Sequence, residues 1–277
     1  MAKSSRMRLD EVVVAHGLAP TRSAARGLIM AGLVRVDGQM RDKAGMLVAS
    51  DADIALKQRP RFVSRAGEKL AYALETFAVD VTGVSALDVG ASTGGFVDCL
   101  LQAGARRVIA LDVGRGQLDG RLRNDPLVHP VERVNARYLT SELLPFIPDL
   151  FTMDISFISV SKVLPAVMGC MAPGCRGLVL VKPQFEAGPH QVGKGGIVRD
   201  PEVHREVLLN LGRFVIVELD ARLLGVCGSG LPGTNGNVEF FLHLVRGGES
   251  GWGLDTLEAA VDTLVPRVSN DGAVSQT

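Results

Sequence analysis

The chain is poor in cysteine and lacks any long hydrophobic run. No stretch approaches the roughly 20 apolar residues of a membrane span, and the first residues, MAKSSRMRLDEVV, lack the apolar core and cleavage site of a secretory signal. The four cysteines show no paired metal-site spacing, so we expect buried thiols in a reducing compartment: Cys99, Cys170, Cys175 and Cys227. These absences predict a cytoplasmic protein with no membrane insertion and no bound metal.

The net charge is zero, but the charges are unevenly distributed. Residues 1–69 hold 13 Lys and Arg against 7 Asp and Glu, whereas residues 70–277 hold 17 against 23. A basic segment joined to a larger acidic one is typical of a protein that binds a polyanion through the basic part. An ordinary solubilising surface is the other interpretation, and charge alone does not decide between them.

Residues 1–58 predict a small α+β domain. Apolar spacing indicates a helix over 8–18 and a second helix between Thr21 and Gly32. The Asp-Gly pair in LVRVDGQM predicts a hairpin, and DADIAL predicts a further strand. Residues 59–66 read as an interdomain linker. The candidate polyanion contacts are basic side chains of the small domain, of the linker and of one later turn: Arg6, Arg8, Arg22, Arg35, Lys43, Arg59, Arg65 and Arg137.

Residues 67–268 predict an α/β domain. Strand-like apolar runs occur at 85–89, 107–112, 149–155, 177–182, 214–219, 221–227 and 238–245. Helical runs such as 95–103 and 159–171 lie between several of them, and this alternation predicts a mostly parallel sheet covered on both faces. The last run follows a loop rather than a helix, so we expect it to be antiparallel. We expect the tail, residues 269–277, to be disordered.

The segment LDVGASTGGF is compatible with two kinds of site. Its Gly90-to-Gly94 stretch fits the G-x-S-x-G elbow of a hydrolase, with Ser92 as nucleophile and Asp154 and a later histidine as partners. It also fits a glycine-rich turn that cradles a nucleotide-like cofactor. We favour the cradle, because this strand is the first of its sheet and no upstream loop can build an oxyanion hole. The cradle residues are then Asp88, Gly90, Ala91, Ser92, Thr93, Gly94, Gly95 and Phe96.

Two further residues fit a nucleoside cofactor. Asp112 ends the next strand, at an offset from the turn that suits hydrogen bonds to a ribose diol. Asn135, in the RVNAR segment, is placed to read an adenine edge, although an ordinary turn asparagine fits that position equally well.

Charged residues stand at the ends of the apolar strands. Asp154 and Lys182 follow two of them, Glu239 precedes the last one, and Lys69 lies in the helix that leads into the sheet. Charges at such positions are costly unless paired or functional, and ligands collect at the carboxyl ends of parallel strands. A lysine there can take the proton of a sugar hydroxyl or stabilise the developing alkoxide, and the sequence leaves that choice open.

These motifs together resemble the TlyA family, the bacterial rRNA 2′-O-methyltransferases once named hemolysin A. The resemblance covers residues 6–247 and rests on segments that include FVSRAGEKL, ALDVGASTGGF, DISFIS, LVKPQFE, GKGGIVRD and GNVEFFLHL. The first 60 residues resemble the αL-type RNA-binding module of ribosomal small-subunit protein four, except that Ala44 stands where the family usually has proline.

The resemblance implies a Rossmann-like methyltransferase domain with a seven-stranded sheet. It also implies S-adenosylmethionine (SAM) at the 90–96 turn and a catalytic Lys-Asp-Lys-Glu tetrad at Lys69, Asp154, Lys182 and Glu239. The implied substrate is a cytidine ribose in small- or large-subunit rRNA within ribosomal subunits, with a link to capreomycin-type antibiotic susceptibility. The complete N-terminal module favours action on both rRNAs, and we expect a monomer. A membrane-damaging hemolysin-like protein and a non-catalytic ribosome-assembly factor remain as alternatives.

Overall fold

The computed structural model describes residues 5–57, 60–219, 221–248 and 251–266. The chain divides into two compact units, Met1–Pro60 and Arg61–Thr277. The predicted tail and Arg59 lie outside the described residues. Within the described residues, no helix is both long and apolar enough to cross a bilayer.

The first unit is a small α+β fold. Helices α1 (Leu9–Ala15) and α2 (Arg22–Met30) pack together over a core that includes Leu9, Val13 and Ile29. Strand β2 (Val34–Val36) pairs antiparallel with β3 (Gln39–Met40) and with β5 (Ile54–Leu56), and β1 (Arg6–Arg8) pairs with β4 (Leu47–Ala49).

The structure confirms the hairpin that the Asp-Gly pair predicts and the start of the second helix at Thr21. Asp37 and Gly38 both have positive φ, 49° and 76°, as a tight hairpin turn requires. Thr21 caps α2 by accepting a hydrogen bond from the Ala24 amide at 3.1 Å. The β1–β4 pair was not predicted, because two strands of three residues each carry too short a pattern.

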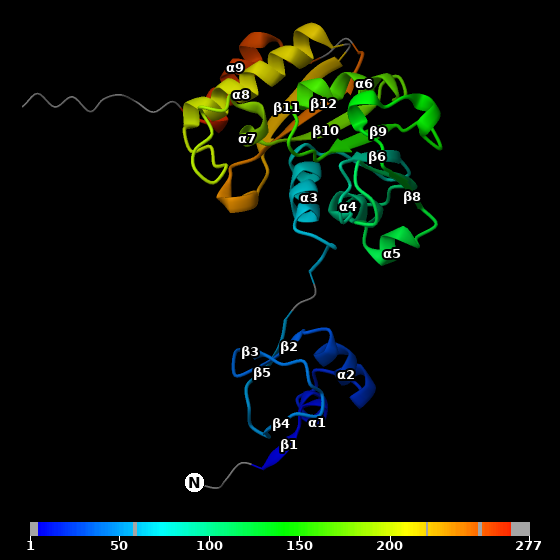
Figure 1. Ribbon diagram of the computed structural model, residues 1–277, viewed down its shortest axis with the longest axis vertical. Helices are drawn as coiled ribbons and strands as arrows, with labels where there is room; N and C mark the ends of the chain where they lie inside the picture. Colours follow the sequence, from blue (N-terminus) through cyan, green and yellow to red (C-terminus); the bar gives the residue numbers. More distant parts are fainter. Residues whose placement is uncertain (1–4, 58–59, 220, 249–250, 267–277) are drawn as a thin grey trace, which may run out of the picture. The chain divides into compact units, whose positions relative to one another are not determined.

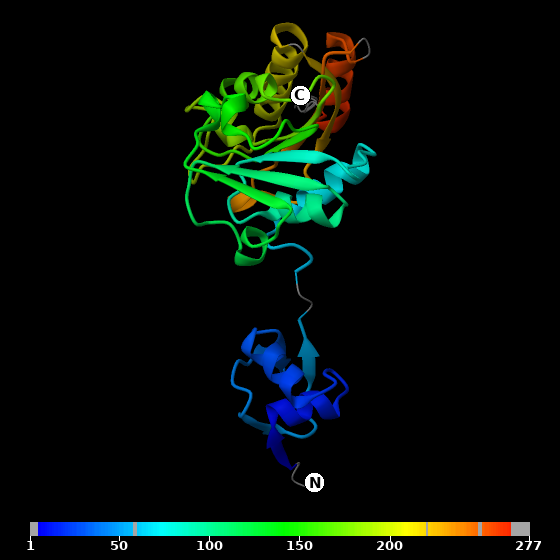
Figure 2. The ribbon, with the colours of Figure 1, turned by 90° about the vertical axis from the view of Figure 1, so that its right-hand side faces the viewer.

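The second unit is built on a seven-stranded sheet, which can be followed in Figure 1 and Figure 2. Its spatial order is β11-β12-β10-β9-β6-β7-β8. The neighbours in the run from β10 to β8 pair parallel, and β12 is antiparallel to both β10 and β11. The strands are β6 (Ser85–Val89), β7 (Arg107–Asp112), β8 (Val128–Glu132), β9 (Leu150–Met153), β10 (Arg176–Val181), β11 (Ala221–Gly228) and β12 (Phe240–Arg246).

Helices cover both faces of this sheet (Figure 1). On one face, α3 (Ala66–Thr76), α4 (Gly95–Gln102) and α5 (Gly120–Arg123) enclose one apolar core. On the other face, α6 (Leu164–Gly169), α8 (Pro201–Arg213) and α9 (Leu254–Leu264) enclose a second. The short α7 (Pro183–Glu186) follows β10 directly. Phe62 also packs into the core beside α3 and α4, so this end of the predicted linker is held by the sheet unit.

One predicted strand is wrong. Residues 214–219 do not join the sheet: Phe214–Glu218 form a wide helical turn, η4, that continues α8. Within this turn Val215 is buried and Val217 is exposed, whereas in a strand these two residues would share one face. The β-branched residues of FVIVE favoured the strand prediction. The preceding helix continues through this segment, and the strand begins only at Ala221.

The antiparallel direction of β12 has a consequence for the site. The amino end of an antiparallel strand lies at the edge of the sheet where the parallel strands end. Phe240 is registered opposite Val181, and Met153 pairs with Val179 on the other side of β10. Asp154, Lys182 and Glu239 are therefore brought to one edge by three adjacent strands.

Candidate functional site

The turn after β6 is packed so tightly that Gly90 and Gly95 leave no room for a side chain. Gly90 has φ +86°, and a Cβ there would lie 2.5 Å from the carbonyl oxygen of Asp154. A Cβ on Gly95, the first residue of α4, would collide with the Ser64 hydroxyl. The glycines thus let the 90–96 turn pass close to neighbouring backbone, which is the property that a cofactor cradle needs.

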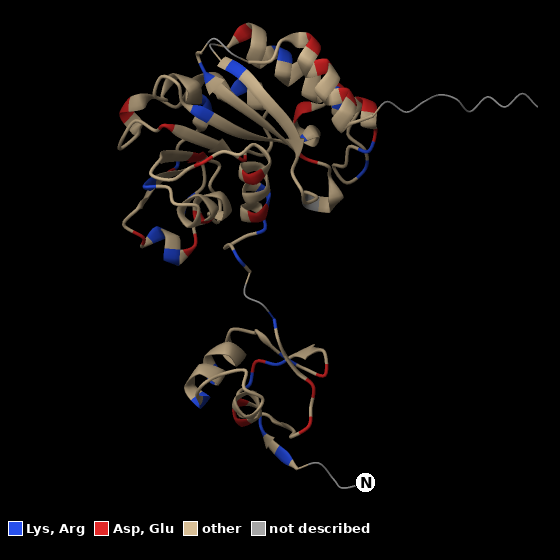
Figure 3. Cartoon of the chain, turned by 180° about the vertical axis from the view of Figure 1, so that it is seen from behind, with Lys and Arg blue, Asp and Glu red and all other residues tan. Residues whose placement is uncertain are grey.

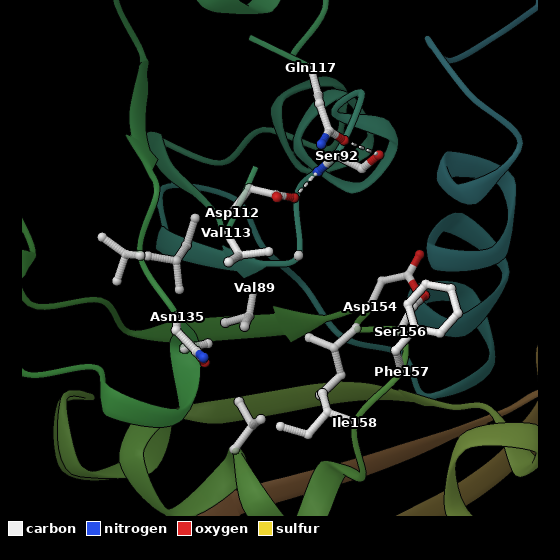
Figure 4. A pocket seen from close by; sticks show the side chains of 16 residues that line it. Val89, Ser92, Asp112, Val113, Gln117, Asn135, Asp154, Ser156, Phe157 and Ile158 are labelled. Carbon is white, nitrogen blue, oxygen red and sulfur yellow. Dashed lines mark hydrogen bonds between the residues drawn. The ribbon is translucent and has the colours of Figure 1, made fainter. Parts of the chain in front are cut away.

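A cavity of about 370 Å³ opens beside this turn. Figure 4 shows Ser92, Asp112 and Gln117 together at one side of it and Asp154, Ser156 and Phe157 together at another. The volume lies in the range of small-molecule sites. The cavity walls are largely apolar, with polar groups at a few positions, so the arrangement suits a ligand with both an apolar body and hydrogen-bonding ends.

Asp112 is fixed at the rim of this cavity by two backbone amides. Its Oδ2 accepts from the Ser92 amide and its Oδ1 from the Gly114 amide, both at 2.7 Å. Asn135 also lines the cavity, and its side chain accepts from the Arg137 amide at 3.0 Å. Asn135 therefore combines the two interpretations of its position, since it caps a turn and faces the cavity.

Asp88 is buried beneath the turn. Its Oδ1 accepts from the Thr152 hydroxyl at 2.8 Å, while Oδ2 is buried with no hydrogen-bond partner among the described residues. Burial raises the pKa of Asp88 to about 8, the nearby Asp154 and Asp112 charges add to the rise, and the Thr152 hydrogen bond opposes it. Asp88 and Asp154 both line a smaller cavity of about 100 Å³ at the turn, together with Ala91, Thr93 and Phe96.

The surroundings of Ser92 favour the cradle over the nucleophile. Its hydroxyl lies 3.4 Å from Gln117 Oε1, not beside a histidine. His204 is buried against Phe240 and hydrogen-bonds the Val198 carbonyl. His243 is buried against Phe77, and burial lowers its pKa to about 4. Neither histidine is placed to activate the Ser92 hydroxyl.

The four charged residues of the predicted tetrad form two ion pairs. Lys182 Nζ lies 2.6 Å from Asp154 Oδ1, and Lys69 Nζ lies 2.5 Å from Glu239 Oε2. All four side chains are at most 20% exposed. Lys69 comes from α3, and the other three stand at the sheet edge described above. Each lysine therefore balances one carboxylate where neither would be stable alone.

Ser156 links this edge to a second cavity. Its hydroxyl accepts a hydrogen bond from Lys182 Nζ at 3.0 Å. Ser156 and Phe157 line both the 370 Å³ cavity and an adjoining cavity of about 320 Å³, which Lys182 and Glu239 also line. Three of the four catalytic candidates, Asp154, Lys182 and Glu239, thus line one or other of these adjoining cavities.

Three residues at this site were missed from the sequence: Gln117, Ser156 and Asn237. Asn237 is buried, accepts from the Val198 amide at 3.0 Å and donates to the Gly196 carbonyl at 2.9 Å, so it joins two loops of the second cavity. Ser156 lies in the DISFIS segment and Asn237 in GNVEFF, so both belong to segments that the sequence analysis had already singled out. No local pattern distinguishes a polar residue that faces a cavity from one that faces water.

Among the candidate RNA contacts, Arg8 and Arg22 both reach the buried carboxylate of Asp10. Arg6, Arg35 and Lys43 are exposed on the same unit. In the second unit, Arg65 donates to the Pro232 carbonyl at 3.4 Å, and the Arg137 guanidinium lies 5.6 Å from the centre of the Tyr138 ring. Within the described residues, no group of three or more His, Cys, Asp or Glu has the geometry of a metal site.

Comparison with known proteins identifies two family models along the chain. The FtsJ-like methyltransferase family matches residues 62–246, and the S4 domain family matches residues 7–54. The chain is 46% identical over 247 residues to the 16S/23S rRNA (cytidine-2'-O)-methyltransferase TlyA of Mycobacterium tuberculosis, covering 86% of this chain and 90% of that one. It is 41% identical to Hemolysin A of Brachyspira hyodysenteriae, covering 86% of this chain and all of that one.

A solved structure, described as that of a hemolysin from Streptococcus thermophilus, matches with a TM-score of 0.71 at 36% identity, covering 94% of this chain and 96% of that one. The fold predicted from the sequence is confirmed: a mostly parallel seven-stranded methyltransferase sheet with its last strand antiparallel, preceded by an S4 domain. The chain therefore belongs to the FtsJ-like methyltransferases, and among them to the TlyA and hemolysin A family.

Proposed function

We propose that this protein transfers a methyl group from SAM to the ribose 2′-oxygen of a cytidine in rRNA. The observation that carries the proposal is the Lys182–Asp154 pair at the boundary of two cavities, one of which lies against a glycine turn. A relative with 46% identity is named as a 16S/23S rRNA (cytidine-2'-O)-methyltransferase, which supplies the substrate class.

The residues around the first cavity fit SAM. Asp112, held by two amides, retains acceptor capacity for the ribose hydroxyls of an adenosyl group. The unpartnered Oδ2 of Asp88 beside the smaller cavity suits the ammonium group of a methionyl tail. When bound, SAM supplies an electrophilic methyl group on a sulfonium. The protein's part is to hold the cofactor and to present the accepting hydroxyl.

Lys182 is the group that acts on the ribose. An ammonium has three N–H donors, and Asp154 and Ser156 orient Nζ from two directions. The remaining direction is available to a 2′-oxygen in the second cavity. There Lys182 can stabilise negative charge as an ammonium, or accept the departing proton if it is first deprotonated to the neutral amine. Asp154 and Ser156 fix the lysine, and Glu239, which Lys69 pairs with, also lines this cavity.

The second cavity suits the target nucleotide. The Phe157 side chain is 90% exposed and its ring centre lies 5.0 Å from that of Phe185. Phe157 also has φ +66°, an unfavourable backbone conformation for a large side chain. An exposed aromatic ring held in such a conformation beside a cavity is typical of a surface that stacks on an unpaired base.

The finer assignments follow from the same proposal. The S4 unit grips rRNA mainly through phosphates, and a complete S4 unit favours action on both ribosomal subunits. Such an enzyme works in the cytoplasm, where ribosomes are, and its loss is expected to lower susceptibility to capreomycin-type antibiotics. Mapping 2′-O-methylcytidine by mass spectrometry in rRNA from cells with and without the gene tests these assignments.

Lys182→Ala tests the site itself. Methyl transfer to rRNA should fall by at least about a thousandfold, within the range lost with a positioned charged group, while calorimetry finds SAM binding retained. A variant with undiminished methylation would refute the role of Lys182. If no substitution at the site reduces methylation, the activity belongs to a contaminating enzyme, and the assembly-factor alternative is favoured. Leakage of liposomes caused by the pure protein would instead favour the membrane-damaging alternative.

A further inference from the structure

The S4 unit contains a buried carboxylate with more cationic partners than charge balance requires. The Asp10 side chain is fully buried near the start of α1. Arg8 makes a two-pronged contact with it, with Nε on Oδ1 and Nη2 on Oδ2, both at 3.0 Å. Arg26 Nε lies 3.0 Å and Arg22 Nη2 lies 3.3 Å from Oδ2. One guanidinium would neutralise this carboxylate, and three converge on it.

The three arginines come from two separate elements and keep their outer edges accessible. Arg8 ends β1, whereas Arg22 and Arg26 lie one turn apart on α2, so they share a face of that helix. The arginine side chains are 37%, 51% and 53% exposed in chain order. Each guanidinium has five N–H donors. Asp10 engages only some of them, and the half-exposed Glu11 takes one more, since its Oε1 lies 3.1 Å from Arg22 Nη1. Figure 3 shows the same pattern, with basic segments on β1 and α2 and an acidic one on α1 between them.

The loop that carries Lys43 is attached to the same point. The Asp10 amide donates to the Ala44 carbonyl at 3.1 Å, and a Cβ on Gly45 would lie 3.2 Å from Arg8 Nη1. The Gly45 backbone therefore packs directly against the Arg8 guanidinium. Three guanidinium groups thus surround the buried Asp10, and the loop that follows the exposed Lys43 is anchored beside them.

We propose that Arg8, Arg22 and Arg26 form one RNA phosphate-binding surface and that Asp10 is its positioning residue. Guanidinium groups bind phosphate through paired, charge-assisted hydrogen bonds, and their value depends on fixed geometry. Asp10 holds three flexible side chains in place before RNA arrives, so the entropy of ordering them is not lost on binding. The proposal rests on the proposed function in that rRNA is the ligand, and it adds Arg26 and Asp10 to the binding machinery.

Asp10→Asn gives opposite results under the two interpretations of this cluster. Removing a negative charge from a basic surface should tighten RNA binding if charge alone matters. If Asp10 positions the arginines, the full-length variant should bind 16S and 23S rRNA transcripts more weakly, on the order of fivefold at fixed salt. Binding that is equal or tighter would overturn the proposal.

A second variant covers the case in which Asp10→Asn fails to fold. Arg26→Ala removes a half-exposed side chain and leaves Asp10 two partners, so the unit should stay folded. Its affinity should fall, and the slope of log affinity against log salt between about 50 and 200 mM should decrease by roughly 0.7 to 0.9. Arg26→Lys keeps the charge and should restore the slope but not the full affinity. An unchanged slope in Arg26→Ala would exclude this arginine from the surface.

Arg213→Ala is the matched control. Arg213 is also a half-exposed arginine, and it pairs with Glu258 at 2.8 Å in the second unit. This variant should leave RNA affinity and salt slope unchanged. If wild-type protein binds rRNA but never methylates it, the proposed function fails while these affinities still decide the role of Asp10.

Discussion

Replacing Asp88 by asparagine should change how the stability of the methyltransferase unit depends on pH. In the folded protein the pKa of Asp88 is raised to about 8 by burial, whereas in the unfolded chain an aspartate titrates near 3.9. Between these values the folded state holds a proton that the unfolded state has released. Unfolding therefore becomes easier as the pH rises through this window, by about 1.4 kcal/mol per pH unit.

The expected magnitude follows from the width of the window. Between pH 5 and pH 7, Asp88 alone should lower the free energy of unfolding by about 2.7 kcal/mol. Asparagine has the same shape, keeps an acceptor for the Thr152 hydroxyl and does not titrate. The stability of Asp88→Asn minus that of the wild type should therefore grow by about 2.7 kcal/mol across that range. This difference cancels the titration of other groups, including His243.

Urea unfolding followed by tryptophan fluorescence measures this difference. Trp252 is the single tryptophan of the chain and packs against the core under α8 and α9, so it reports on this unit. Asp119→Asn is the control, because the Arg121 amide lowers the pKa of Asp119 and its contribution is lost only as the pH falls below about 3.9, so its difference from wild type should stay constant from pH 5 to pH 7. A difference between Asp88→Asn and wild type that stays constant from pH 5 to pH 7 would refute a neutral Asp88.

Three further predictions concern the site. Asp112→Ala should weaken SAM binding by about tenfold or more in calorimetry, because it removes the acceptor for the ribose and frees the Ser92 amide; unchanged affinity would exclude the ribose contact. Ser156→Ala should lower kcat and shift its pH profile with little change in KM for RNA, because Ser156 orients Lys182. Ser156→Thr should retain most of the activity, and the control Ser161→Ala should match wild type. A rise in KM alone would contradict the role of Ser156 in orienting Lys182. A chain lacking residues 1–60 should bind SAM normally and lose rRNA methylation, and full activity of that chain on intact rRNA would show that the S4 unit is dispensable.

The order of strands and helices was largely predictable because it depends on local patterns. The apolar runs at 85–89 and 107–112 are strands with those bounds, since buried parallel strands are continuously apolar. The run at 214–219 failed for a physical reason. The segment FVIVE is short, and its composition suits a half-buried strand as well as the end of an amphipathic helix. Only the helix that precedes it decides between the two.

The site was predictable in its residues but not in its pairings. The sequence singles out Lys69, Asp154, Lys182 and Glu239 as charges at strand ends or near them, and it cannot say which lysine meets which carboxylate. That assignment depends on strand order, because β12 lies between β11 and β10 and runs antiparallel to both. Ser156 and Asn237 were missed for the same reason, since their partners are 26 and 39 residues away in the chain.

The pairing of the tetrad also answers an electrostatic problem in the proposed reaction. The methyl donor is a cation and the acceptor belongs to a polyanion. Two unpaired lysines would repel the sulfonium, and two unpaired carboxylates would repel RNA. The Lys182–Asp154 and Lys69–Glu239 pairs hold four charges at this edge of the sheet with no net charge, and three of them line the two cavities. Lys182 can then act on a developing alkoxide through a short, directed contact while the approach of either ligand meets no net repulsion. The same reasoning explains why removing Asp154 should damage SAM binding as well as catalysis: it would leave the Lys182 ammonium unbalanced beside the donor.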